Sequence, residues 1–228
     1  MGKYGPGNAK VDDLTALEYG RFFDAVHAPE HLILDKFFAG IEDYLVNATW
    51  ILEEWLLVGA AQKERTPPVA PVNQQGMVYR RVLSFADLRM ELHLKNLVIR
   101  IRAGWDKILN NILAPWFDAR HPKGWPNRWA GRINHLDQLI GATGAETPRY
   151  WADWKRNAEE YTSLGLRDMR EGELHYWSKR VRENFGNSAG EITLDALQRL
   201  VVQEHFRLMD VWLLTIAMLR SVQPTGAA

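Results

Sequence analysis

One run of about thirty residues with helical periodicity limits the possible folds more than any other feature. Between Glu30 and Gln62, apolar residues recur every three or four positions: Leu34, Phe37, Phe38, Ile41, Tyr44, Leu45, Ala48, Ile51, Leu52 and Trp55. Acidic and basic residues occupy the positions between them. At a rise of 1.5 Å per residue this helix would be about 45 Å long. Its apolar side needs other long helices to cover it, so the run predicts a helical bundle.

The same periodicity predicts the other helices. Pro29 suits the first turn of the long helix, where its missing N–H costs nothing. The remaining expected helices are Val11–Ala25, Met77–Leu113 with Pro115 beyond its end, Trp129–Ile140, Pro148–Tyr161, one beginning near Asp168, and Leu194–Leu219 capped by Thr193 or Ser188. No segment shows a sustained alternation of apolar and polar residues, so we expect an all-α protein without a sheet.

The sequence predicts a single all-α domain spanning residues 1–228, built as a bundle of long antiparallel helices. No repeat of 20–50 residues occurs, and no linker separates two apolar cores. An irregular insertion of loops and short helices is expected at about residues 114–165, where prolines and tryptophans interrupt the pattern. We expect the last residues, about 223–228, to form a flexible tail.

Composition excludes several classes of function. The 28 basic and 28 acidic residues give no net charge, which disfavours a surface that binds nucleic acid over its whole extent. The chain contains no cysteine, so it has no disulfides, no thiolate metal sites and no cysteine nucleophile. The longest apolar run, Val211–Leu219, is far shorter than the roughly 20 residues that span a bilayer. We therefore expect a cytoplasmic protein without a membrane partner.

Motifs for metals and cofactors are missing as well. Helical bundles often hold two iron ions with Glu-x-x-His pairs, and this motif does not occur in the chain. Glu91 and His93 are only two positions apart, which places them about 200° apart on a helix. No phosphate-binding Gly-Lys-Ser/Thr loop and no Gly-x-Ser-x-Gly nucleophile turn is present. The sequence predicts no metal and no cofactor.

The stretch "LRDMREGELH" contains the strongest candidate for chemistry. It contains Arg167, Arg170 and His175 just after an irregular region. An arginine can grip two phosphate oxygens, and a histidine can move a proton near neutral pH. Together they can cleave a phosphodiester without metal. Arg170 and His175 can converge if Arg170 lies at the start of a helix. Within one regular helix they would lie about 140° apart.

This stretch resembles the Arg-x4–6-His motif of the HEPN superfamily, whose members are all-α bundles with two long helices and two or more shorter ones. Many members are metal-independent ribonucleases of the toxin or defence type, with an active site formed between two subunits. The resemblance implies Arg170, His175 and Arg167 as catalytic residues, with Arg167 and Arg170 binding phosphate. It also implies RNA or a nucleotide as partner; a partner antitoxin is not identified by the sequence. We expect a homodimer, because long helices with exposed Trp-rich surroundings tend to associate.

Two observations leave a second interpretation open. The same Arg-to-His spacing also occurs at Arg21–His27, Arg128–His135 and Arg199–His205. The charges around His175 can equally be those of a solvated helix start, with His175 and Trp177 packed on neighbouring helices. The ten tryptophans of the chain suit helix seams and interfaces. The alternative is a non-enzymatic dimerisation or interaction module, in which His93 and His205 also have structural roles.

Overall fold

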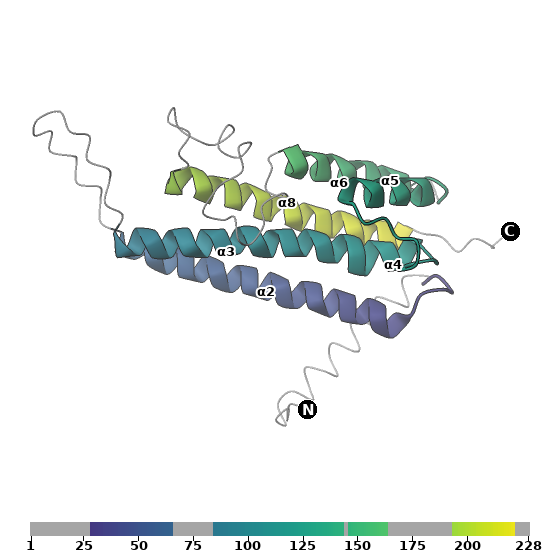
Figure 1. Cartoon of the computed structure of the whole chain (residues 1–228), viewed down its shortest axis with the longest axis horizontal. Coiled ribbons are helices and arrows are strands. Elements are labelled where there is room, and N and C mark those ends of the chain that lie inside the picture. The colour runs from purple at the N-terminus through teal and green to yellow at the C-terminus, as the bar shows by residue number, and fades with distance from the viewer. Residues whose placement is uncertain (1–27, 66–83, 144–145, 164–192, 222–228) are drawn as a thin grey trace, which may run out of the picture.

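The computed structural model describes residues 28–65, 84–143, 146–163 and 193–221. Their regular secondary structure is entirely helical, and this part of the chain contains no strand (Figure 1). The all-α prediction is therefore confirmed. The helices expected at Val11–Ala25 and from Asp168, and the expected tail, lie outside the described residues. No helix within these ranges is long and apolar enough to cross a membrane.

The two longest elements of the first half, α2 (Leu34–Glu64) and α3 (Phe85–Lys107), pack along their length as an antiparallel pair (Figure 1). The first turn of α2 was predicted too early. Leu32 donates its backbone N–H to the carbonyl of Pro29, which forms a separate turn, and Ile33 is the N-cap residue. The buried face of α2 includes Phe37, Ile41, Ile51 and Val58.

The last helix, α8 (Leu194–Ser221), packs on α3 and meets α2 through side-chain contacts. Thr193 caps it by accepting a hydrogen bond from Ala196 N at 3.2 Å, as predicted. Tyr44 stacks on Trp212 with ring centroids 4.3 Å apart, and Trp55 Nε1 donates to His205 Nδ1 at 3.0 Å. Because the later residue of α2 meets the earlier residue of α8, the two helices run antiparallel.

Two shorter helices, α5 (Trp129–Ile140) and α6 (Glu146–Ser163), lie further along the chain, after α3. The bounds of α5 are those predicted, and α6 is two residues longer at each end than expected. Helix α6 packs on α8 and contributes large aromatic side chains to the core. Tyr161 stacks on Trp105 of α3 with centroids 4.9 Å apart, and Trp154 meets the same ring edge-on at 5.5 Å.

A buried ion cluster joins α6 to α8. Glu204 is fully buried and pairs with Arg207, whose guanidinium also contacts Glu160 Oε2 at 2.7 Å. Burial raises the pKa of Glu204 to about 7, although Arg207 pulls in the opposite direction. Removing two charged groups from water costs free energy that their attraction only partly offsets. The charge of Glu204 is therefore costly in the folded protein, and its protonation near neutral pH would affect stability.

The end of α3 differs from the prediction. We expected the helix to stop at Leu113 because Pro115 follows, but the chain continues through a π-helix, η1 (Ile108–Leu113), into a short α4 (Ala114–Phe117). Pro115 has no N–H to donate to the carbonyl of Asn111, and its ring crowds that carbonyl. The wider turn, in which Ala114 N–H bonds to Leu109 O, lets the proline be accommodated without ending the helix.

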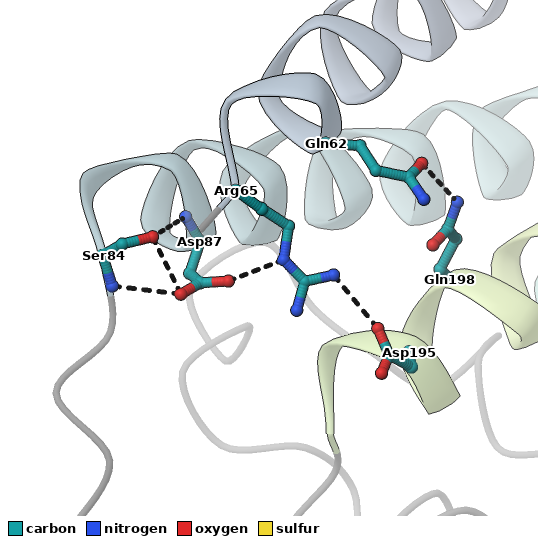
Figure 2. A network of polar contacts seen from close by, with 6 residues as sticks. All are labelled: Gln62, Arg65, Ser84, Asp87, Asp195 and Gln198. Atoms are coloured by element: carbon teal, nitrogen blue, oxygen red, sulfur yellow. Dashed lines mark hydrogen bonds and ion pairs between the residues drawn. The ribbon is translucent and has the colours of Figure 1, made fainter. Parts of the chain in front are cut away.

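At the opposite end of the bundle, one arginine links α2, α3 and α8. Figure 2 shows Arg65, just after α2, donating to Asp87 Oδ1 at 2.8 Å and to Asp195 Oδ1 at 3.1 Å. Asp87 also forms a capping box with Ser84 at the start of α3. Burial alone would raise the pKa of Asp87, but the bonds from Ser84 and Arg65 outweigh it and lower the pKa.

Candidate functional site

Only some of the candidate residues from the sequence analysis lie in the part of the chain that the structure describes. Arg167, Arg170 and His175 lie outside the described residues, so their arrangement stays a prediction. His93 and His205 have structural partners: His93 Nδ1 lies 2.7 Å from Glu54 Oε2 of α2, and His205 accepts the hydrogen bond from Trp55. Burial lowers the pKa of His205, which favours the neutral ring that this bond requires.

A cleft of about 480 Å³ with a mixed polar and apolar lining opens at the end of the bundle where α2 begins and η1 and α4 end. We call it the bundle-end cleft. One wall is the start of α2, the floor comes from η1 and Pro115, and the other wall is the loop after α4. Its polar lining residues are His31, Lys36, Asp43, Asn110, Asn111, Asp118 and His121. None of these residues was proposed as functional from the sequence.

Asp118 organises the loop wall. Its side chain is almost fully buried, and Oδ1 accepts the backbone N–H of Arg120 at 2.8 Å. His135 Nε2 of α5 lies 2.7 Å from Oδ2. Burial by itself would raise the pKa of Asp118, but these hydrogen bonds and the nearby positive charges outweigh it and lower the pKa. Asp118 is therefore a carboxylate at neutral pH that is already matched by partners.

His121 lies on the same loop and faces the cleft. Its ring meets Trp125 edge-on, with centroids 5.4 Å apart. Burial lowers the pKa of His121; the charge of Asp118 opposes this effect and that of Arg132 adds to it. Burial therefore favours the neutral ring, whereas a ligand with negative charge would favour its protonated form.

The α2 wall carries a carboxylate with partners and an ammonium without one. Asp43 forms an ion pair with Lys107 of α3. Lys36 is exposed, and among the described residues no carboxylate lies within ion-pair distance of it. At the mouth, His31 Nε2 lies 3.2 Å from the carbonyl of Pro115. Both carboxylates of the cleft are thus neutralised by the protein itself, whereas the charge of Lys36 is not.

The π-helix fixes the floor of the cleft and its connection to the loop. Arg132 of α5 donates to Asn110 Oδ1 at 2.6 Å and to the carbonyl of Pro126 at 2.7 Å, so it ties the loop to η1. Asn111 turns its amide toward Asp43, with Nδ2 3.5 Å from Oδ2. That contact is long, so this amide can reorient toward a ligand. π-Helical turns occur often at functional sites.

Sequence reasoning missed this cleft for a clear reason. Its groups come from α2, η1 and a loop, and no fixed spacing connects Lys36 with His121. The nearest signal is "DARH", in which Asp118, Arg120 and His121 fall within four residues of a Pro- and Trp-rich loop. The Arg128–His135 pair matched the Arg-to-His spacing, but the structure gives His135 a different partner, Asp118.

Within the described ranges, no group of three or more His, Asp or Glu side chains could hold a metal ion. Comparison with known proteins gave no relative: no family model matches the chain, and neither curated proteins nor solved structures include a significant match. The bundle-end cleft is therefore interpreted from its own geometry.

Proposed function

We propose that the protein binds a small phosphate ester, such as a mononucleotide, in the bundle-end cleft. The observation that carries this proposal is the charge balance of the cleft. Asp43 forms an ion pair with Lys107 and Asp118 with Arg120, whereas Lys36 has no such partner among the described residues. An anionic ligand would give Lys36 the negatively charged partner that the described part of the protein does not supply. The volume of the cleft lies within the range of small-molecule sites, roughly 300–1,000 Å³.

The individual groups suit such a ligand. Lys36 would supply a positive charge, and the amide of Asn111 a neutral donor. His121 would add a charge-assisted hydrogen bond once protonated, and the bound phosphate would raise its pKa. Ile33, Pro115 and Pro122 offer apolar surface for the remainder of the molecule. Affinity should increase as the pH falls from 7.5 to 6, because more of the histidine is protonated.

Isothermal titration calorimetry with AMP tests this proposal. Lys36→Met removes the charge but keeps the length of the side chain. It should weaken binding by about 10- to 100-fold, the usual worth of one charge-assisted hydrogen bond. Lys63→Met, an exposed lysine in the last turn of the same helix, is the matched control and should bind like the wild type. Absence of binding by the wild type at millimolar AMP, or equal losses in the two variants, would refute the proposal.

A metal-independent ribonuclease is the second candidate. It is supported by the motif "LRDMREGELH" and by the all-α fold, in which two long helices precede the segment that contains His175. In this proposal His175 moves the proton, Arg170 and Arg167 hold the phosphate, and two HEPN-like subunits share the site. RNA cleavage in EDTA by the wild type, lost in His175→Ala, would support it. Equal activity of both proteins would reject it.

A further inference from the structure

The outer surface of α2 and α8 carries apolar side chains that are not covered by the described structure. We call this surface the α2–α8 apolar face. It consists of six residues: Leu45, Leu52 and Leu56 of α2, and Phe206, Met209 and Leu213 of α8. Their exposed fractions range from 42% for Leu45 to 75% for Leu56. Soluble monomers rarely expose a continuous apolar surface of this kind without a function for it.

These residues form one surface because of how the two helices face each other. Tyr44 and Trp55 mark the side of α2 that meets α8, and Leu45, Leu52 and Leu56 lie about a quarter turn away from it. The side of α2 that meets α3 lies in the other direction, where Asn47 donates to the carbonyl of Arg100. The exposed stripe of α2 therefore points away from α3.

The stripe of α8 points the same way. Trp212 and His205 mark its side toward α2, and Leu208 packs near Gly104 of α3. Phe206, Met209 and Leu213 lie about a quarter turn from the α2 contact, on the side opposite Leu208. Since Tyr44 meets Trp212, the antiparallel register places Leu45 level with Leu213 and Leu52 level with Phe206. The two stripes run side by side for about 10 Å.

We propose that this face binds the same face of a second copy of the chain and forms a homodimer. The six exposed fractions amount to about 500–700 Å² if a fully exposed side chain of this size offers roughly 150–200 Å². Each partner of a stable complex buries about 800 Å², so the six side chains alone supply most of the area that a stable dimer needs. None of the six side chains is charged, so the two stripes place no like charges opposite one another.

The geometry of the helices also fits a second copy. Helices α2 and α8 are an antiparallel pair with one apolar face, which is half of a four-helix bundle. A two-fold axis parallel to the helices lays α2 of each copy on α8 of the other. Every neighbouring pair of helices in that bundle is then antiparallel, and the interface is self-complementary as a two-fold dimer requires. This inference does not depend on the bundle-end cleft.

Sedimentation equilibrium and light scattering of the full chain test this inference. The wild type should have twice the 26.3 kDa mass of one chain. Leu52→Glu and Phe206→Glu should each reduce it to one chain, with the helical circular dichroism unchanged. Leu88→Glu, at an exposed apolar residue of α3, is the matched control and should remain dimeric. A monomeric wild type would overturn the proposal. The α2–α8 apolar face would then be covered by another part of the same chain or by another protein.

Crosslinking tests the same face without disrupting it. The chain has no cysteine, so Leu52→Cys introduces a single reactive position. A short bismaleimide should join two chains through Cys at position 52 in high yield, and Leu88→Cys should give little product. A higher yield for Leu88→Cys than for Leu52→Cys would place the interface elsewhere and overturn the proposal.

Discussion

Replacing Gly40 with alanine tests how closely α2 approaches the π-helix. A Cβ at this position would lie 2.6 Å from the carbonyl oxygen of Asn111 and 3.0 Å from its Cβ. The first distance is far inside van der Waals contact, and the oxygen belongs to the backbone, so it cannot rotate away. The ring of Pro115 prevents a regular α-helical turn there, so this carbonyl does not accept the usual helical hydrogen bond from residue 115.

Two effects of opposite sign determine the magnitude. Glycine in a helix interior is less favourable than alanine by about 1 kcal/mol, so the substitution gains that amount from the backbone. Forcing a methyl group into a packed contact costs about 1–3 kcal/mol. Gly59 is also inside α2, but a Cβ there would meet nothing within 4 Å. Gly59→Ala should therefore show the gain alone, and Gly40→Ala the sum of both effects.

Urea unfolding of the two variants, monitored by circular dichroism, measures the difference. We expect Gly59→Ala to be about 0.5–1 kcal/mol more stable than the wild type, and Gly40→Ala to be about 1–3 kcal/mol less stable than Gly59→Ala. If both variants gain the same stability, the close approach of α2 and η1 is not present in solution. The floor of the bundle-end cleft would then differ from the one described.

Three further predictions concern charged groups. Because the pKa of Glu204 is raised from 4.5 to about 7 in the folded protein, stability should fall by up to about 3 kcal/mol as the pH rises from 4.5 to 7. Urea unfolding between pH 5 and 8 should show this slope, and Glu204→Gln should abolish it; an unchanged slope contradicts the assignment. Asp118→Asn should cost about 1–3 kcal/mol at pH 7 through the lost bond to His135. Folding lowers the pKa of Asp118, so the cost of Asp118→Asn should shrink as the pH falls below the pKa that Asp118 has in the unfolded chain. A cost that does not change with pH would refute this prediction. Arg65→Met should destabilise the protein and lessen the protection of amides in the first turns of α3 and α8 from hydrogen exchange; uniform loss across all helices would contradict a local role.

The sequence predicted the positions of regular helices more reliably than the places where a helix departs from regular α-helical geometry. Trp129–Ile140 was placed correctly because its apolar spacing is bounded by Pro126 and Gly141, which are local signals. The helix through Pro115 was predicted to stop too early, since the chain accommodates the proline in a π-helical turn, whose Asn111 carbonyl lies against Gly40. Local rules do not include such a contact.

The two proposed binding surfaces, the α2–α8 apolar face and the bundle-end cleft, also depend on contacts that the sequence does not reveal. Leu45 and Leu52 belong to the periodic pattern that predicted α2, and the sequence alone does not distinguish them from core residues such as Ile51. Their exposure appears only once α3 and α8 occupy two sides of the helix. The cleft was missed because its residues converge from separate elements.

The proposal that the bundle-end cleft binds a phosphate ester is tested most directly by NMR titration of His121. In the free protein the pKa of His121 should lie below that of an ordinary histidine, because the side chain is partly buried. Saturating AMP should shift the pKa of His121 upward, and Lys36→Met should greatly reduce that shift at the same AMP concentration. A pKa of His121 that is unaffected by AMP, or that shifts equally in Lys36→Met, would contradict the account.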